Sequence, residues 1–364
     1  MLNMANEENL TPPSIQLGNR VISTDSYPYI IAEIGVNHEG SLDLAKHLID
    51  LAKEGGADAA KFQSYKAETL ASKNSPSYWD TTKEETRSQY DLFKKYDCFN
   101  EKEYVTLAEH CKKVGIDFLS TPFDDLAVEF LDPLCPFFKI ASADLTNIPL
   151  LRKIASKGKP VILSTGASLI DEIKVALNTL QSAGCSNVGL LHCILNYPTE
   201  NGNAHLNMIK GLQKTFPNYV IGYSDHTLPN DEMTSLVCAH LLGAAVLEKH
   251  FTYDKKLRGN DHYHAMDVND LKKCIDVLKR TRDLLGNIKN KEPIPSENIA
   301  RLNARRSIVA KKDLPIGHIL TEGDLICKRP GTGIESMHWD RVIGSKLIRM
   351  VEEDDVLQWK DLKV

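Results

Sequence analysis

The 364-residue sequence has no long hydrophobic run. A membrane-spanning helix needs roughly 20 consecutive apolar residues, and no segment approaches that length. The first residues, Met1 to Pro13, are polar and lack the apolar stretch of a secretory signal. We therefore predict a cytoplasmic protein without a membrane partner.

The sequence also lacks a strong excess of charge and any paired cysteine motif. Its net charge of −5 gives no electrostatic reason to expect a nucleic-acid partner. The 8 cysteines are scattered without a CxxC pair, so we expect reduced, mostly buried thiols. With 42% hydrophobic and 26% charged residues, the composition is typical of an ordinary globular protein.

Short apolar runs alternate with helix-like segments over the first 250 residues. The apolar runs predict strands that end at residues 33, 63, 120, 140, 164, 192, 224 and 250. Between Ser41 and Lys53 the apolar residues fall on one face of a helix, and Ser168-Leu-Ile-Asp171 is typical of a capping box. Eight β-then-α units predict a (β/α)8 TIM barrel rather than a doubly wound sheet.

The remaining segments indicate a second, smaller domain. We predict an N-terminal extension over 1–28, the barrel over 29–285, a linker over 286–306 and a β-rich domain over 307–364. Short strands are expected in this last domain at 307–310, 319–320 and 325–328. The last segment is too short for an independent catalytic core, so we expect an accessory module. A long insertion after the second strand, residues 64–100, is expected to be functional or disordered.

Polar and ionisable residues end nearly all of the predicted strands. A barrel holds its active site at the carboxyl ends of its strands, so these residues should share one rim. They are Glu33, Lys61, Gln63, Ser120, Thr121, Lys139, Ser142, Ser164, His192, Ser224, His226, Glu248 and His250.

Two lysines of this rim, Lys61 and Lys139, lie inside apolar runs. A buried ammonium group needs a partner, so we expect each lysine to face an anion such as a phosphate or carboxylate. The rim hydroxyls would add hydrogen-bond donors. Pairing with barrel carboxylates, or exposure of the lysine heads at an edge, is the alternative.

Two histidines and a glutamate indicate a cation site. His226 and His250 follow adjacent strands and are a plausible pair of ligands for a divalent cation, with positions left open for water and substrate oxygens. Hydrogen-bonded structural histidines are the alternative. Glu33 could act as a general acid or base, orient a metal-bound water, or neutralise Lys61.

Tyr197 and Asp261 lie in the loops that follow the sixth and eighth predicted strands. Tyr197 could stack on a sugar or hydrogen-bond to it, and Asp261 could bind sugar hydroxyls. Loop packing and a solvated loop are the alternatives.

Taken in order, the motifs at the strand ends resemble the sialic acid synthase family. The segments that carry the resemblance are Ile31-Ala-Glu-Ile-Gly-Val-Asn-His38, Lys61-Phe-Gln63, Ser120-Thr-Pro-Phe123, Lys139-Ile-Ala-Ser142, Leu163-Ser-Thr-Gly166, Gly222-Tyr-Ser-Asp-His-Thr227 and Leu247-Glu-Lys-His250. Near the C-terminus, Lys328-Arg-Pro-Gly331 is similar to the antifreeze-like (SAF) domain that follows the barrel in that family.

The resemblance implies an enzyme that condenses phosphoenolpyruvate (PEP) with an N-acetylmannosamine-type aldehyde to give a sialic-acid-like nine-carbon sugar. It implies manganese or magnesium held by His226 and His250. PEP would lie against Lys61, Thr121, Lys139, Ser142, Ser164 and Ser224. In a domain-swapped homodimer, the sugar would meet Gln63, Tyr197, Asp261 and the partner subunit's Arg329.

The resemblance also assigns two catalytic carboxylates. Glu33 would position a metal-bound oxygen, and Asp144, where the family usually has a glutamate, would activate water. Ile194 and Leu195 stand where the family has small polar residues, which removes an expected PEP donor unless Asn196 replaces it.

The insertion at 64–100, which contains Tyr78-Trp79-Asp80, does not resemble the bacterial N-acetylneuraminate branch, and it is a candidate for the sugar pocket. N-acetylmannosamine, its 6-phosphate and 2,4-diacetamido-6-deoxy sugars all remain as acceptors.

Three other functions compete with this interpretation. A Schiff-base aldolase would use Lys139 as nucleophile and need no metal. A metal-dependent hydrolase barrel would need a His-x-His motif that the first strand lacks. A non-catalytic protein that binds through the SAF-like tail would leave the polar rim unexplained.

Overall fold

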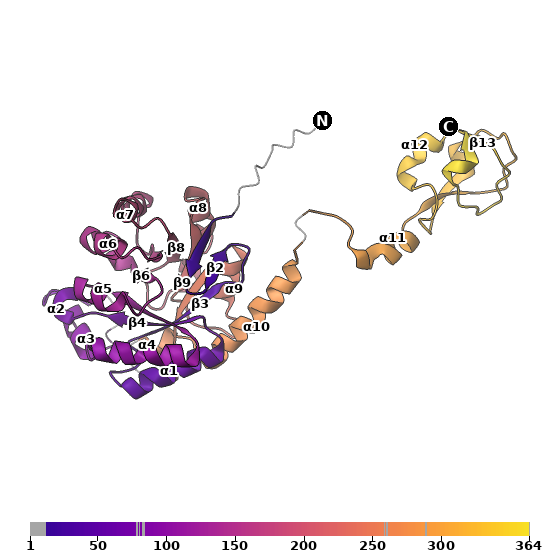
Figure 1. Cartoon of the computed structure of the whole chain (residues 1–364). Coiled ribbons are helices and arrows are strands. Elements are labelled where there is room, and N and C mark those ends of the chain that lie inside the picture. Colours follow the sequence, from indigo (N-terminus) through magenta and orange to yellow (C-terminus); the bar gives the residue numbers. More distant parts are fainter. Residues whose placement is uncertain are drawn as a thin grey trace. The chain divides into compact units, whose positions relative to one another are not determined.

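The computed structural model describes residues 12–363 except 78, 80, 82, 83, 258, 260, 288 and 289. The chain divides into two compact units, Met1–Leu285 and Gly286–Val364. Figure 1 labels many of their elements. Among the described residues, no helix combines the length and apolar character needed to cross a bilayer.

Eight parallel strands form a nearly closed barrel in the larger unit (Figure 1). They are β3 (Tyr29–Gly35), β4 (Ala59–Ser64), β5 (Asp117–Pro122), β6 (Phe138–Ile140), β7 (Val161–Ser164), β8 (Val188–Cys193), β9 (Val220–Asp225) and β10 (Val246–His250). Hydrogen-bonded ladders join them in the order β5-β4-β3-β10-β9-β8-β7-β6. The predicted (β/α)8 TIM barrel is confirmed, and each predicted run overlaps one strand.

Helices surround the strands and connect them (Figure 1). They are α1 (Leu42–Gly55), α2 (Ala67–Leu70), α3 (Gln89–Tyr96), α4 (Glu101–Val114), α5 (Asp125–Leu131), α6 (Ile148–Ala155), α7 (Ile170–Ser182), α8 (Met208–Thr215), α9 (Thr234–Leu241) and α10 (Val268–Leu285). In α1 the Ser41 hydroxyl accepts a hydrogen bond from the Leu44 amide at 3.2 Å. Gly56 ends this helix at φ +95°, a conformation that glycine adopts without strain.

The capping box predicted at Ser168 and Asp171 is wrong. The Ser168 hydroxyl donates to the Gly166 carbonyl instead. Glu172 accepts a hydrogen bond from the Leu169 amide at 2.7 Å, so the helix begins one residue later than the motif predicts. Ser-x-x-Asp and the overlapping Leu-x-x-Glu compete for this terminus, and the longer glutamate side chain reaches the backbone amide.

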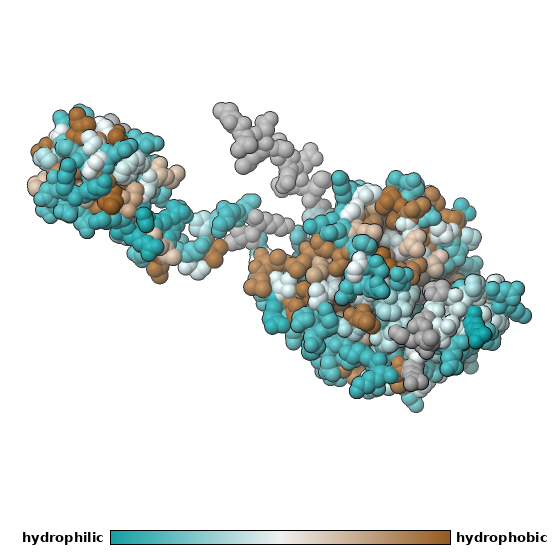
Figure 2. Space-filling view, turned by 180° about the vertical axis from the view of Figure 1, so that it is seen from behind, coloured by the Kyte–Doolittle hydropathy of each residue, from teal (hydrophilic) through white to brown (hydrophobic). Residues whose placement is uncertain are grey.

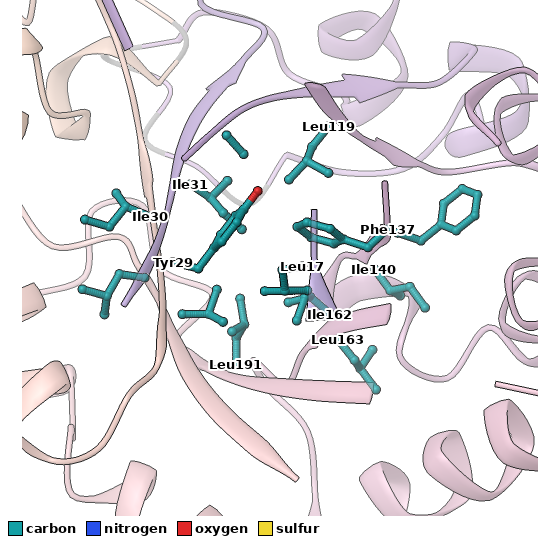
Figure 3. Packing of buried hydrophobic residues seen from close by; sticks show 14 of the residues in the cluster. Leu17, Tyr29, Ile30, Ile31, Leu119, Phe137, Ile140, Ile162, Leu163 and Leu191 are labelled. Atoms are coloured by element: carbon teal, nitrogen blue, oxygen red, sulfur yellow. The ribbon is translucent and has the colours of Figure 1, made fainter. Parts of the chain in front are cut away.

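The barrel core is continuous with a short N-terminal hairpin. Strands β1 (Ser14–Leu17) and β2 (Arg20–Ser23) pair in antiparallel fashion. Their buried side chains join the core cluster of the barrel: Ile15, Leu17 and Ile22. Within this core the rings of Tyr29 and Phe137 meet edge to face at 5.7 Å (Figure 3). Arg20 donates to Asp58, which precedes β4, at 2.6 Å. The hairpin therefore covers the amino ends of the strands and leaves the opposite rim free.

The smaller unit has its own hydrophobic core and short elements. They are α11 (Asn298–Ala304), β11 (Ser307–Ala310), β12 (Leu325–Lys328), α12 (Trp339–Val342), β13 (Lys346–Leu347) and β14 (Leu362–Lys363). Two predictions of local structure differ from what is found. Helix α11 lies inside the predicted linker, and the expected strand at 319–320 forms only an isolated bridge between Ile319 and Lys346. On the faces visible in Figure 2, both units mix hydrophilic and hydrophobic residues, as globular surfaces ordinarily do.

Candidate active site

Strand register brings the predicted catalytic residues together at the carboxyl rim. His250 on β10 pairs with Glu33 on β3, and Glu33 pairs in turn with Lys61 on β4. Glu248 on β10 pairs with Ser224 on β9. Side chains alternate between the two faces of a strand, so Glu248 and His250 point to the same side. Most of the rim residues therefore face one cavity of about 600 Å³. Ser120 and His192 do not line it: the Ser120 hydroxyl shares a hydrogen bond with that of Ser64 at 2.6 Å, and His192 Nε2 lies 2.8 Å from the Ala204 carbonyl.

Lys61 is 3% exposed and lies between two carboxylates. Its ammonium is 2.6 Å from Glu33 Oε2 and 3.7 Å from Glu248 Oε2. It also donates to the Thr121 hydroxyl at 3.2 Å. Burial alone would lower the pKa of Lys61, but the Glu248 and Glu33 charges hold it above its ordinary value. Lys61 therefore stays charged at this rim.

Lys139, equally buried, has weaker charge compensation. It donates to the Ser164 hydroxyl at 2.7 Å and to the Ile140 carbonyl at 3.1 Å, and its ammonium is 3.7 Å from Glu248 Oε1. Burial lowers the pKa of Lys139, and the Lys61 charge adds to this effect although Glu248 opposes it. A bound anion would therefore stabilise the charged form of Lys139 more than that of Lys61.

Glu248 was placed on the rim from the sequence but given no role. It joins the two lysines and accepts a hydrogen bond from the Ser224 hydroxyl at 3.0 Å. Burial opposes its ionisation, but the Lys139 and Lys61 charges lower the pKa of Glu248 below its ordinary value. In this structure Lys61 and Lys139 thus pair with barrel carboxylates, as the alternative interpretation of the sequence expected. The predicted hydroxyls lie around the same ammonium and carboxylate groups.

Glu33 accepts a second hydrogen bond, from the Gln63 amide at 2.9 Å. Burial raises the pKa of Glu33 despite the neighbouring Lys61 charge. Glu33 can therefore hold a proton more readily than an exposed glutamate. Gln63, predicted to contact the sugar, lies in the cavity lining beside Glu33.

The predicted histidine pair lies together at one side of the mouth. The rings of His226 and His250 are 5.4 Å apart, and the Tyr197 ring is 4.2 Å from that of His226. His226 Nδ1 is 2.7 Å from the Ile194 carbonyl, so this nitrogen carries the proton and Nε2 is left as the free lone pair. Burial lowers the pKa of His226 to about 4 and that of His250 well below its ordinary value. A neutral imidazole is the form of histidine that can bind a metal ion.

Asp261 and His264 complete the cluster. Asp261 Oδ2 is 3.4 Å from His250 Nδ1. Low solvation in the mouth and the Glu33 charge raise the pKa of Asp261 to about 7. Ligand atoms of His250, Asp261 and His264 all lie within 4.8 Å of one another. The sequence pointed to Asp261 but missed His264, although the short Asp261-His-Tyr-His264 stretch carries three potential ligands.

The predicted water-activating carboxylate lies at the same cavity. Asp144 ends a short 3-10 turn, Ser142–Asp144, that follows β6. Its Oδ1 accepts a hydrogen bond from Asn147 at 3.1 Å, while its buried Oδ2 has no hydrogen-bond partner within the part of the chain that is described. Burial raises the pKa of Asp144. The Ser142 hydroxyl is already engaged, because it accepts from the Gly166 amide at 2.9 Å.

Part of the cavity lining is aromatic. This part consists of Tyr65, Trp79, Phe93, Tyr96 and Phe123, and four of these five come from the insertion at 64–100. The Tyr65 ring meets the Phe93 ring edge to face at 5.3 Å. Two residues of the predicted Tyr78-Trp79-Asp80 feature, Tyr78 and Asp80, lie outside the described residues. Leu195 lines the cavity and Asn196 does not.

Arg329 is the one predicted site residue outside the larger unit. It follows β12 in the smaller unit and is exposed. All other predicted site residues line the single cavity described above: Glu33, Lys61, Gln63, Thr121, Lys139, Ser142, Asp144, Ser164, Tyr197, Ser224, His226, His250 and Asp261.

Comparison with known proteins identifies the family. The NeuB family model matches residues 48–290, and the SAF domain model matches residues 305–363. An N,N'-diacetyllegionaminic acid synthase of Legionella pneumophila is 38% identical over 92% of this chain and 94% of that protein. The N-acetylneuraminate-9-phosphate synthase of Homo sapiens is 35% identical over 90% of this chain and 91% of that protein.

A solved structure agrees with these relatives. The N-acetylneuraminic acid synthetase of Leptospira borgpetersenii, crystallised with citrate, superposes with a TM-score of 0.71 at 34% identity and covers 80% of this chain and 96% of that one. The resemblance seen in the strand-end motifs is confirmed: the chain belongs to the NeuB family of sialic and nonulosonic acid synthases and carries a C-terminal SAF domain.

Proposed function

We propose that this chain condenses PEP with an N-acetylmannosamine-type aldehyde to form a sialic-acid-like nine-carbon sugar and phosphate. The observation that carries the proposal is the pair of buried lysines, Lys61 and Lys139, which share Glu248 beside an imidazole cluster in one cavity. A phosphorylated, carboxylated enol is an anion that two such cations can bind side by side.

PEP would lie against the two ammonium groups and the surrounding hydroxyls. Lys61 remains held by Glu33, while Lys139 has no carboxylate closer than 3.7 Å among the described residues. We therefore assign the more highly charged phosphate group of PEP to the Lys139 side. The Ser164 and Ser224 hydroxyls, which now bond to Lys139 and Glu248, can turn to donate to PEP oxygens.

A divalent cation, manganese or magnesium, fits the imidazole side of the mouth. His250 Nδ1 is buried and has no hydrogen-bond partner in the described part of the chain, and the free Nε2 of His226 provides a second donor. When bound by His226 and His250, such a cation supplies Lewis-acid polarisation of a carbonyl group. The family relationship and these unpaired nitrogens both support its presence.

The reaction forms one carbon–carbon bond and breaks one carbon–oxygen bond. C3 of PEP attacks the aldehyde carbon, and Glu33 gives the proton that turns the aldehyde oxygen into a hydroxyl. Asp144, whose Oδ2 has no hydrogen-bond partner among the described residues, takes a proton from the water that adds to C2. Phosphate then leaves with the bridging oxygen, and the keto acid product remains.

The aromatic part of the cavity lining favours a deoxygenated, acylated acceptor. Tyr65, Phe93 and Phe123 present apolar surface that suits N-acetyl groups and a 6-methyl group. We therefore propose a 2,4-diacetamido-6-deoxy hexose as acceptor in preference to a 6-phosphate. Gln63, Tyr197 and Asp261 would contact its hydroxyls.

We also propose the domain-swapped homodimer that the motifs imply, with the partner subunit's Arg329 contacting the sugar. Exposure of Arg329 in the smaller unit leaves its guanidinium available for this contact. A chain of this kind acts in the cytoplasm, where PEP is present.

Incubation with manganese, PEP and a panel of hexosamines tests the function. PEP labelled with ¹⁸O at the bridging position should give labelled phosphate together with a new nine-carbon keto acid. Label in the keto acid, or phosphate release without sugar, would refute the proposed carbon–oxygen cleavage. Faster turnover with N-acetylmannosamine 6-phosphate than with the 6-deoxy sugar would refute the acceptor assignment.

One observation favours a second function. The lowered pKa of Lys139 suits a nucleophilic amine, as a Schiff-base aldolase requires. Borohydride reduction in the presence of pyruvate would then attach pyruvate to Lys139, and activity would survive chelation.

A further inference from the structure

Asn147 holds one oxygen of the carboxylate that we expect to activate water. It lies between the 3-10 turn Ser142–Asp144 and helix α6 (Ile148–Ala155). Its side-chain Nδ2 donates to Asp144 Oδ1 at 3.1 Å, and its backbone amide donates to the Asp144 carbonyl at 2.9 Å. Asn147 is not part of the cavity lining, so it acts on the site through Asp144.

The start of α6 decides which way the side-chain amide of Asn147 points. Its Oδ1 accepts a hydrogen bond from the Leu150 amide at 3.4 Å, as the side chain of an N-cap residue does. Its backbone carbonyl accepts from the Leu151 amide at 3.0 Å. Leu150 and Leu151 are buried in the core cluster of the barrel, which fixes this end of the helix. Because the amide oxygen faces a donor, the NH2 group is the part that faces the carboxylate.

This arrangement leaves the second oxygen of Asp144 for a partner that enters the cavity. Asp144 lines the cavity, and its Oδ2 has no hydrogen-bond partner among the residues that the structure describes. The terminal torsion of an aspartate is broad and weakly restricted. The hydrogen bond from Asn147 to Oδ1 restricts that torsion and so keeps Oδ2 in one orientation.

The same hydrogen bond opposes the effect of burial on Asp144. Burial raises the pKa of Asp144, and the hydrogen bond from Asn147 lowers it. The ionisable groups of the same cavity on β6 and β8, Lys139 and Cys193, form no hydrogen bond or ion pair with Asp144. Among the described residues, Asn147 is therefore the group that favours the ionised carboxylate, which is the form that accepts a proton.

We propose that Asn147 is a positioning residue: its amide holds Asp144 in the orientation in which Oδ2 takes a proton from water. The inference rests on the role of Asp144 in the proposed function. The competing explanation is that Asn147 serves only as the cap of α6. The two explanations predict different behaviour when the cap is kept and the NH2 group is removed.

Asn147→Asp makes that change. Aspartate caps a helix as well as asparagine does, so capping alone predicts a variant like wild type. Aspartate has no NH2 group to donate, and it places a second negative charge beside Asp144. Both changes raise the pKa of Asp144, whose ionised form is the active one. We therefore expect the fall of kcat on the acid side to begin at higher pH, by about one unit or more.

Asn207→Asp is the matched control. Asn207 precedes α8 and is exposed, so this substitution adds the same charge at the start of another helix. The acid side of its kcat profile should coincide with that of wild type. An unshifted profile in Asn147→Asp, or an equal shift in Asn207→Asp, would overturn the proposal.

Asn147→Ser separates orientation from substrate binding. Serine also caps a helix, but its shorter side chain does not reach the Asp144 carboxylate. We expect kcat to fall by about tenfold or more, with the KM values for PEP and sugar close to those of wild type, because Asn147 lines no part of the cavity. Raised KM values with an unchanged kcat would contradict a positioning role.

Direct titration of Asp144 separates the inference from the proposed function, because it needs no turnover. In protein labelled with ¹³C at the aspartate carboxyl carbons, the Asp144 signal is the one that disappears in Asp144→Asn. This signal should titrate at higher pH in Asn147→Ser than in wild type. An unchanged midpoint would overturn the inference even if the wild-type chain condenses PEP with a sugar. A raised midpoint in a chain that condenses no sugar would remove the proposed function and leave the hold of Asn147 on Asp144 standing.

Discussion

Replacing Glu248 with Gln would remove the negative charge that two buried ammonium groups share. Glu248 oxygens lie 3.7 Å from the ammonium of Lys61 and 3.7 Å from that of Lys139. At an effective dielectric constant of about 20, each pair is attracted by about 4 kcal/mol. Lys61 keeps Glu33 at 2.6 Å, but Lys139 would keep only the Ser164 hydroxyl and a backbone carbonyl. We therefore expect a loss of about 3–5 kcal/mol in the free energy of unfolding.

Thermal unfolding with and without inorganic phosphate measures this effect. A loss of about 3–5 kcal/mol corresponds to a midpoint lower by about 6–10 °C. Added phosphate should raise the midpoint of Glu248→Gln more than that of wild type, because the anion meets the same two lysines with less competing negative charge.

Glu129→Gln provides a matched surface control. Glu129 on α5 also lies between two lysines, Lys153 and Lys157, but its side chain is 51% exposed. Exposed ion pairs contribute little to stability because water screens them, so its midpoint should stay close to that of wild type. Equal midpoints for the two variants, or no extra protection of Glu248→Gln by phosphate, would refute the reasoning about buried charge.

Four further predictions follow from the site and from the smaller unit. His250→Ala should abolish condensation and weaken manganese binding, and retained activity with a chelator present would contradict this. Arg329→Ala should raise the KM for sugar and leave the KM for PEP unchanged. Mixed dimers of the Arg329→Ala and His250→Ala variants should regain activity if subunits exchange SAF domains. Failure of this complementation would argue against the domain swap. Truncation after Leu285 should leave little turnover, and wild-type turnover by the fragment would remove any catalytic role of the SAF domain. The Arg349 guanidinium, 2.7 Å from Asp361, lowers the pKa of that carboxyl against the effect of burial. The stabilisation that the ionised Asp361 gives to the folded state is therefore present at neutral pH and lost as the pH falls through the folded pKa. Asp361→Asn should reduce hydrogen-exchange protection of the smaller unit at neutral pH but not in acid.

The barrel was predictable because its strands repeat one simple pattern. Each parallel strand is buried on both faces and reads as an apolar run, and polar residues lie at or near the carboxyl ends of nearly all of them. Side chains along β10 alternate between the two faces of the strand, as expected. Glu248 and His250 face the cavity, while Lys249 points the other way and pairs with Asp225 at 2.8 Å. Glu33, Lys61 and Lys139 could be placed on the rim for the same reason.

The sequence could not predict which side chains from distant parts of the chain contact one another. The shared position of Glu248 between two lysines depends on strands far apart in the chain that only the closed barrel brings together. His264 was missed because nothing in Asp261-His-Tyr-His264 tells which histidine turns toward Thr252 and which toward His250. That choice is made by the 3-10 turn.

Local competition explains the smaller errors. Ser168 and Leu169 both have an acidic residue three positions later, and only the geometry of the loop after β7 decides which pair caps α7. The polar composition of 286–306 predicted a linker, yet α11 forms there and the Leu302 carbonyl accepts a hydrogen bond from the Gly331 amide at 2.7 Å. Contacts within the smaller unit, rather than local sequence, stabilise this short helix.

The most direct test of the account is the proximity of the cation to the phosphorus of bound PEP. In the protein loaded with manganese and PEP, pulsed electron–nuclear double resonance should detect a dipolar coupling between manganese and ³¹P that corresponds to a separation within the dimensions of this single cavity. The coupling should disappear in Lys139→Met. Tight binding of both ligands without any such coupling would place them in separate sites and contradict the account.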